Sequence, residues 1–225
     1  MHAPVGILML DSRFPRPPGD LGHDGTFPFP VVRHVVAKAS PERVVRRNDT
    51  TLLEPFLEGA RRLADEGAVV ITTSCGFLTP FQTALCEAVD VPVATSALMQ
   101  VPLVEATLGA RRCAVVTIAG RSLTAQHLTA VGVAPDAVVE TTEGGRELTR
   151  AILGDEAALD REAARDDVVE AARRAARRPG VGAIVLECTN MTPYAADAAR
   201  ATGLPVFTIV DLVCWLRAGV SPRSW

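Results

Sequence analysis

Two cysteines stand at positions where a thiol can do chemistry. Cys75 directly follows the apolar run AVVITTS, and Cys188 follows the apolar run GAIVLE. A Thr-Pro step lies four residues after each of them, which is typical of the start of a helix. A helix N-terminus lowers the pKa of a nearby thiol and binds anions, so each segment predicts a reactive thiolate beside an anion site. Two opposed thiols can remove a proton from one face of a carbon and return one to the other face.

The segments around the two cysteines are copies of one pattern. Residues 71–95 align without a gap on residues 184–208, and this alignment pairs Cys75 with Cys188. Eight of the 25 aligned positions are identical, where composition alone gives about two. Each copy reads as strand, cysteine, loop, helix and strand. We therefore expect both thiols at the carboxyl ends of parallel strands, where ligands bind in open α/β sheets.

The elements that must position the thiols alternate along the whole chain. Apolar runs of strand length are followed by segments of helical period, which predicts βαβ units and a parallel sheet. The predicted strands are 5–10, 43–47, 68–72, 92–95, 113–118, 137–140, 182–187 and 205–210. Helical spacing or helix caps mark 31–39, 51–66, 79–88, 96–108, 122–130, 156–178 and a segment that begins at Thr192.

These elements predict an α/β fold of two pseudo-symmetric Rossmann-like parallel-sheet lobes with the active site in the cleft between them. The first lobe is expected to comprise residues 1–97 plus 208–225, and the second lobe residues 98–207. A pseudo-two-fold axis between the lobes would place one cysteine on each side of a single cavity. Residues 12–30, rich in Pro and Gly, form a long loop that is a candidate lid over this cavity.

Composition narrows the kind of partner. The chain has 225 residues, 48% hydrophobic content and a formal net charge of −3, so no basic surface for nucleic acid is expected. The N-terminal apolar run stops at Asp11, too early for a signal peptide or a membrane span. We therefore expect a cytoplasmic protein with a small-molecule substrate, no nucleic-acid partner and no membrane contact.

Five cysteines without an export signal indicate reduced thiols, with Cys86, Cys113 and Cys214 in the core.

Three motifs resemble those of the aspartate/glutamate racemase superfamily, which includes hydantoin racemases, maleate isomerases and arylmalonate decarboxylases. ILMLDS at 7–12 is similar to the first strand of glutamate racemases, and TTSCGFL at 72–78 and LECTNM at 186–191 are similar to the two catalytic cysteine motifs. The resemblance spans essentially the whole chain. It implies two α/β lobes, catalysis without a cofactor in the cleft between them, and a homodimer.

The motifs also depart from the family pattern. Amino-acid racemases of the family follow the first cysteine with Asn-Thr, whereas Gly76 and Phe77 stand here. The second motif usually continues as Thr-His or Thr-Glu, whereas Thr189 and Asn190 stand here and resemble maleate isomerases and decarboxylases. The departures argue against aspartate or glutamate itself, and Phe77 favours a less polar substrate. Arylmalonate decarboxylases keep only the second cysteine, so the presence of both favours racemase or isomerase chemistry.

The candidate site residues follow from these motifs. The predicted catalytic residues are Cys75, Cys188 and Asp11, the last being equally compatible with a loop start. The predicted substrate-binding residues are Ser12, Ser74, Gly76, Phe77, Thr117, Thr189 and Asn190. Glu187 is expected to point to the other face of its strand and to form a structural ion pair.

The sequence argues against a cofactor or a metal. The four histidines show no metal-ligand spacing. The single lysine, Lys38, falls in a predicted amphipathic helix, so no lysine is placed for a pyridoxal Schiff base.

Together, the repeat and the motifs predict a cofactor-independent racemase of a small amino acid or related carboxylate, with proton transfer between Cys75 and Cys188. The alternatives are a maleate-type cis/trans isomerase or a malonate decarboxylase, in which one thiol attacks a double bond or delivers a proton. A two-lobed metabolite-binding or thiol redox-sensing protein is the non-catalytic alternative.

Overall fold

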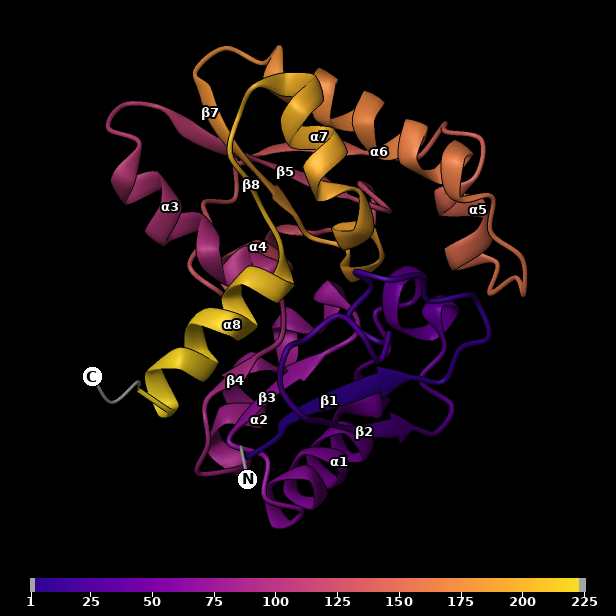
Figure 1. The fold of residues 1–225 in the computed structure, drawn as a ribbon, viewed down its shortest axis with the longest axis vertical. Helices are drawn as coiled ribbons and strands as arrows, with labels where there is room; N and C mark the ends of the chain where they lie inside the picture. The colour runs from indigo at the N-terminus through magenta and orange to yellow at the C-terminus, as the bar shows by residue number, and fades with distance from the viewer. Residues whose placement is uncertain (1–2, 223–225) are drawn as a thin grey trace.

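The computed structural model, which describes residues 3–222, contains two four-stranded parallel sheets (Figure 1). The first sheet has the strand order β2-β1-β3-β4 and the second has the order β6-β5-β7-β8. The strands are β1 (Val5–Leu10), β2 (Val31–Val36), β3 (Val70–Thr73), β4 (Val93–Ala94), β5 (Arg112–Thr117), β6 (Val138–Thr141), β7 (Val181–Leu186) and β8 (Val206–Phe207). The shared strand order confirms the predicted pair of α/β lobes and shows that the sequence repeat is a structural repeat.

Helices and single helical turns connect the strands. The α-helices are α1 (Leu53–Asp65), α2 (Gln82–Ala88), α3 (Val101–Thr107), α4 (Ala125–Thr129), α5 (Leu148–Leu153), α6 (Arg161–Ala176), α7 (Ala195–Thr202) and α8 (Ile209–Val220). The turns are the π-helical η1 (Glu42–Arg46) and the 3-10 helical η2 (Thr50–Leu52), η3 (Gly76–Phe81), η4 (Ala97–Gln100) and η5 (Thr189–Tyr194). In Figure 1 the first sheet with α1 and α2 lies below, and the second sheet with α5, α6 and α7 lies above.

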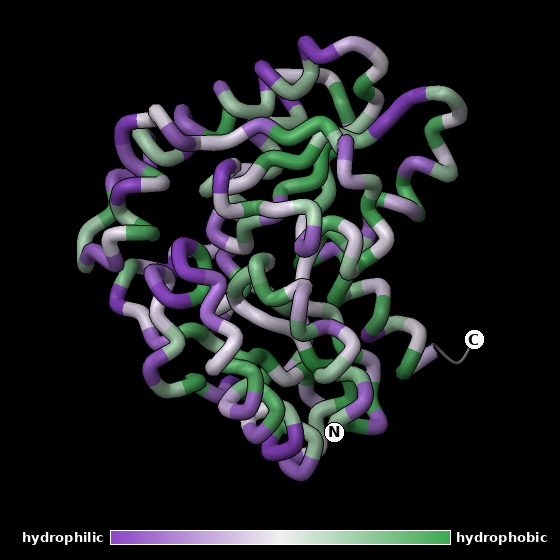
Figure 2. Tube along the Cα trace, turned by 180° about the vertical axis from the view of Figure 1, so that it is seen from behind, coloured by the Kyte–Doolittle hydropathy of each residue, from purple (hydrophilic) through white to green (hydrophobic). Residues whose placement is uncertain are grey.

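The core is formed by strands that are buried on both faces. All six residues of β1 are buried, and the hydrophobic strands run through the middle of each half in Figure 2. Helix α1 covers the first sheet with the predicted stripe, in which Phe56, Ala60 and Leu63 are fully buried. Burial of each large side chain of this kind stabilises the fold by about 1.5–3 kcal/mol. Gly67, with φ +87°, ends the helical segment as its position predicted.

Two predicted elements are wrong. Val31–Val36, expected to be helical, is the edge strand β2. Its β-branched residues favour a strand that pairs with β1, and only Val36 among them is fully buried. Residues 43–47, expected to be a strand, belong largely to η1, where Val44 and Val45 turn into the core. Lys38 consequently lies in a turn, with φ 65°, and not on a helix.

Helical turns start closer to the thiols than their Thr-Pro steps indicated. Turn η3 begins at Gly76 and turn η5 at Thr189, each immediately after its cysteine. The predicted strand 205–210 is likewise cut short, since Thr208 forms a capping box with Asp211 and opens α8.

All five cysteines are free, but they do not share one environment. Cys113 is buried in β5 as expected, and Cys214 is partly buried. Cys86 is exposed on α2, so its assignment to the core is wrong.

The lobes are joined by backbone and side-chain contacts at their facing edges. The Thr189 hydroxyl donates to the Ser74 carbonyl oxygen (2.7 Å), and the Gln100 side-chain amide donates to the Thr208 carbonyl oxygen (2.8 Å). Helix α8 packs on β3 as well as on η5. The exact lobe boundaries at 97/98 and 207/208 stay a prediction. Within residues 3–222, no helix combines the length and the apolar character that a membrane crossing needs.

Candidate active site

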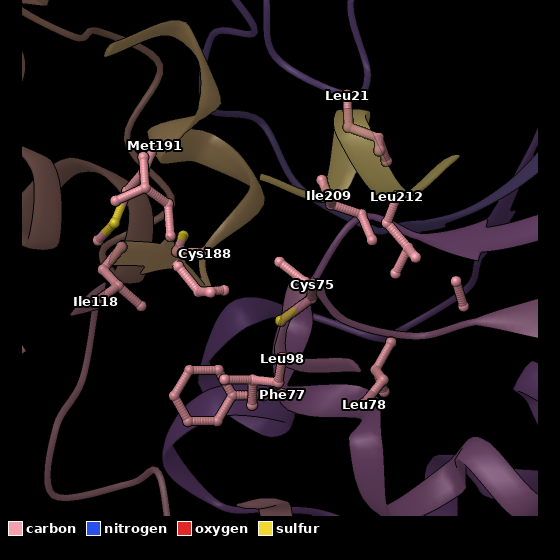
Figure 3. Packing of buried hydrophobic residues seen from close by; sticks show 14 of the residues in the cluster. Leu21, Cys75, Phe77, Leu78, Leu98, Ile118, Cys188, Met191, Ile209 and Leu212 are labelled. Atoms are coloured by element: carbon pink, nitrogen blue, oxygen red, sulfur yellow. The ribbon is translucent and has the colours of Figure 1, made fainter. Parts of the chain in front are cut away.

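A narrow cavity lies where the carboxyl ends of β1, β3 and β7 meet, and both predicted catalytic cysteines line it. We call it the thiol cavity; its lining residues are Leu10, Phe14, Pro41, Val45, Ser74, Cys75, Gly76, Phe77, Ile118, Ile152, Leu153, Glu187, Cys188 and Asn190. Figure 3 shows Cys75 and Cys188 approaching from the two different lobes, with Phe77 and Ile118 beside them. The lining is predominantly apolar and includes no lysine, arginine or histidine.

The surroundings of both cysteines favour the protonated thiol. Burial raises the pKa of Cys75 to about 12, with the negative charge of Glu187 as the second cause. Burial also raises the pKa of Cys188 well above its ordinary value, and Glu187 and Cys75 add to this effect. The backbone N–H groups of Phe77 and Asn190 lower these pKa values by less than burial raises them. The helical turns thus lower the thiol pKa values as expected, but burial outweighs them, so the predicted thiolates are not the favoured forms.

Glu187 lies in the site, although its position in the strand predicted the opposite face. Its side chain is fully buried in the thiol cavity, where Oε2 accepts a hydrogen bond from the Thr117 hydroxyl (2.7 Å). Oε1 has no hydrogen-bond partner, and no cation pairs with the carboxyl group among the described residues, so the expected ion pair is wrong. Burial raises the pKa of Glu187 to about 7. A carboxyl group that both gains and loses a proton near neutral pH thus lies beside both thiols.

Gly76 makes room for this carboxyl group. A Cβ at Gly76 would overlap Glu187 Oε1, and it would lie 2.6 Å from the Glu187 carbonyl oxygen and 2.8 Å from Ser96 Oγ. The absence of a side chain after the first cysteine, which looked like a departure from the family motif, therefore has a steric function here.

Asn190 connects Cys188 to the 12–30 loop. The Cys188 thiol donates to Asn190 Oδ1 (3.6 Å), and Asn190 Nδ2 donates to Asp20 Oδ2 (2.7 Å). Asp20 is fully buried, forms an ion pair with Arg16 (3.0 Å) and accepts from the Gly22 backbone N–H (2.8 Å). The sequence reading missed Asp20 and Arg16; the only signal for them was the unusual length of their loop.

Other predicted binding residues use their polar groups within the protein. The Ser74 hydroxyl accepts from the Leu10 N–H (2.9 Å), which ties β1 to the end of β3. Phe77 packs edge-on against the His127 ring at 5.4 Å. Thr117, whose hydroxyl is taken up by Glu187, does not line the cavity itself.

The structure does not bring Asp11 and Ser12 to the thiol cavity. Asp11 is exposed and accepts from the Lys38 backbone N–H (3.1 Å). Ser12 donates to the Leu10 carbonyl oxygen (3.5 Å) and accepts from Arg16 (3.2 Å). Two thiols, one titratable carboxyl group and apolar walls remain, and this set can exchange protons with the carbon of a small ligand.

Comparison with known proteins identifies the family of this chain. A family model described as Asp/Glu/hydantoin racemase matches residues 20–216. The chain is 31% identical over 241 residues to dimethylsulfoniopropionate lyase of Durusdinium sp. clade D, covering 99% of this chain and 77% of that protein. It is 32% identical over 225 residues to dimethylsulfoniopropionate lyase 5 of Emiliania huxleyi (strain CCMP1516), covering 93% of this chain but only 44% of the longer relative.

Solved structures share the fold. Allantoin racemase from Klebsiella pneumoniae superposes with a TM-score of 0.65 at 21% identity, covering 96% of this chain and 87% of that one. A mutant of arylmalonate decarboxylase in its sulfate-associated form gives 0.63 at 21% identity, with 98% and 94% covered. Picrophilus torridus aspartate racemase gives 0.60 at 13% identity, with 99% and 96% covered. At these identities the likeness establishes the architecture.

Proposed function

Because the chain belongs to the Asp/Glu/hydantoin racemase family, we propose that it removes a proton from the carbon next to the carboxylate of a small substrate. We propose further that this step expels a β-substituent, so that the protein is a lyase acting on dimethylsulfoniopropionate or a similar sulfonium acid. The observation that carries the proposal is the buried carboxyl group of Glu187 in a cavity without a cationic side chain.

The charge of the cavity favours this class of substrate over an acidic amino acid. A second substrate carboxylate, as in aspartate or glutamate, would meet the carboxyl group of Glu187 with no cation in the lining to offset the repulsion. A dimethylsulfonium group is positively charged, and its two methyl groups suit apolar walls such as Phe77 and Ile118. The names of the relatives that match nearly the whole chain support the same choice.

The proposed reaction starts with a proton transfer inside the site. As the sulfonium group enters, its positive charge favours the anionic form of a thiol, and the Cys75 proton passes to the carboxylate of Glu187. The Cys75 thiolate then takes the proton on the α-carbon. The electron pair left behind forms the carbon–carbon double bond, and the bond to sulfur breaks with its electrons remaining on the departing sulfide. Dimethyl sulfide and acrylate leave, and Glu187 returns its proton to solvent, so one proton is released per turnover.

A second candidate function is racemisation at the α-carbon, and the specific observation in its favour is Cys188. Elimination needs one base, whereas racemisation also needs an acid on the opposite face of the carbon. Cys188 lines the same cavity, and burial raises its pKa, which favours the protonated form that such an acid needs. The two candidates share the first step and differ in whether the carbanion is reprotonated or loses a substituent.

The test is product analysis with the purified protein. With dimethylsulfoniopropionate, we expect dimethyl sulfide in the headspace and acrylate in solution in equal amounts, and about 10²–10⁴-fold less of both with Glu187→Gln. A panel of amino acids, hydantoins, maleate and malonates, followed by optical rotation and by proton exchange in deuterated buffer, covers the other reactions of the fold. Turnover of a panel member without any dimethyl sulfide would replace the lyase proposal, and inertness toward every compound would leave a binding role.

A further inference from the structure

The two halves of the repeat treat their thiols differently. In the alignment that pairs Cys75 with Cys188, the residue two positions later is Phe77 in the first copy and Asn190 in the second. Each thiol has the backbone N–H of that residue beside it. The side chain, however, is an apolar ring beside Cys75 and an amide beside Cys188. The two thiols therefore differ in the side chain at this aligned position.

The orientation of the Asn190 amide is fixed by its outer partner. Asp20 forms an ion pair with Arg16, and a carboxylate has lone pairs but no proton to donate. The amide must therefore turn its NH₂ group toward Asp20, at 2.7 Å, and its oxygen toward Cys188. An amide oxygen can only accept, so it stabilises the protonated thiol of Cys188, which donates to it at 3.6 Å. A thiolate at Cys188 would instead face that oxygen with like partial charge.

We propose that Asp20, acting through Asn190, keeps Cys188 protonated and so makes Cys75 the single base of the site. Asp20 is thus a positioning residue, located on the 12–30 loop 170 residues away in the chain from Asn190. The effect of the Asp20–Asn190 contact on turnover rests on the proposed function. Its effect on the ionisation of the two thiols does not.

The other charged groups around Cys188 do not undo this assignment. Cys75, ahead of η3, and Glu187, at the end of β7, face the cavity from both lobes, and Glu187 acts on both thiols with the same sign. From the 12–30 loop, Asp20 disfavours a negative charge on Cys188, while Arg16 favours one on Cys75. The rest of the lining carries no charge and is apolar apart from Ser74; it includes Phe14, Ile118, Ile152 and Leu153.

The experiment follows the modification of each cysteine by methyl methanethiosulfonate, a small thiolate-selective reagent, as a function of pH, with tandem mass spectrometry to separate the sites. In the native protein we expect Cys75 to be modified at lower pH than Cys188. In Asp20→Asn the amide of Asn190 is free to turn. The modification rate of Cys188 at a fixed pH should then rise about tenfold, since lowering the pKa of the thiol by one unit raises the thiolate fraction by that factor. Asp24→Asn is the matched control, because Asp24 lies on the same loop and is exposed in its pair with Arg33; its profiles should equal those of the native protein.

A second variant tests whether the Asp20→Asn substitution acts only by making the 12–30 loop more mobile. Asn190→Ala removes the acceptor and leaves Asp20 and Arg16 in place, and it should raise the Cys188 rate at a fixed pH while the Cys75 rate changes less. The inference is overturned if Cys188 reacts first in the native protein, or if both variants leave its profile unchanged. These outcomes need no substrate, so they remain readable even if the protein releases no dimethyl sulfide.

Discussion

Glu187 is held in the thiol cavity at a cost in stability. Its pKa rises from an ordinary 4.5 to about 7 because burial disfavours the charged form. Between these two pH values the folded protein holds a proton that the unfolded chain has released, so stability falls as the pH rises through this window. The full penalty above pH 7 is about 3 kcal/mol, taking 1.36 kcal/mol for each pKa unit.

We therefore predict that Glu187→Gln is less active but more stable than the native protein at alkaline pH. Glutamine cannot ionise, so its free energy of unfolding should exceed that of the native protein by up to about 3 kcal/mol at pH 8 and by much less at pH 5. Urea unfolding at the two pH values measures this difference. Glu58→Gln, on the exposed face of α1, is the control and should change stability equally at both. A Glu187→Gln difference that does not depend on pH would mean that the carboxyl group is not held neutral by burial.

A second residue-scale prediction concerns Gly76. A methyl group there would displace the Glu187 carboxyl group, so Gly76→Ala should lower turnover about as strongly as Glu187→Gln, by 10²-fold or more on the scale of general acid–base catalysis. Gly219→Ala is the matched control, because a Cβ at Gly219 meets nothing within 4 Å. Full turnover in Gly76→Ala, measured at saturating substrate, would show that the position of the carboxyl group does not matter.

At the scale of elements, one wall of the thiol cavity depends on a cap supplied by another helix. Asp167 of α6 is buried and accepts from the backbone N–H groups of Arg146, Glu147 and Leu148, at 2.7–2.9 Å. These donors open α5, which carries Ile152 and Leu153 into the cavity lining. We predict that Asp167→Ala lowers the free energy of unfolding by about 1–3 kcal/mol, because it leaves buried donors without partners. Asp166→Ala, at the exposed neighbouring position, should cost little, and equal losses in both variants would contradict the cap.

The elements also show what could be predicted from the sequence. The repeat located both cysteines, since its shared residues, such as the Thr-Pro steps, mark the same turns in each copy. The pattern of β2 led to a wrong prediction of a helix. This edge strand is partly buried on both faces, so its valines stand at spacings that a helix also uses: Val31, Val32, Val35 and Val36. Asp20 and Arg16 could not be found this way, because no periodic pattern accompanies a loop residue whose partner lies 170 positions away.

At the scale of the whole molecule, two similar lobes produce an unequal pair of thiols. The strand order is the same in both sheets, so Cys75 and Cys188 follow equivalent strands. The differences come from aligned positions at which the two copies carry different side chains, Asn190 against Phe77 and Glu187 against Ser74, and from the 12–30 loop. Two lobes of the same strand order can therefore hold one thiol that acts as a base and one that stays protonated.

The assembly of the molecule stays a prediction that follows from the family resemblance. We expect a homodimer, and the exposed Trp215 and Val220 of α8 and Leu103 of α3 are apolar side chains that a partner can cover. Light scattering coupled to gel filtration should give twice 23.8 kDa at micromolar concentration. A mass of 23.8 kDa throughout the concentration range would contradict the dimer.

The central claim is that the Cys75 thiolate removes the α-proton, and proton NMR of dimethylsulfoniopropionate in deuterated buffer tests it most directly. The native protein and Cys86→Ser, whose exposed thiol is the matched control, should form the vinyl signals of acrylate at the same rate. Cys75→Ser should form them at least about 100-fold more slowly, because the general base is lost. Acrylate formation at the native rate in Cys75→Ser, or neither acrylate nor deuterium at the α-carbon in any sample, would contradict the account.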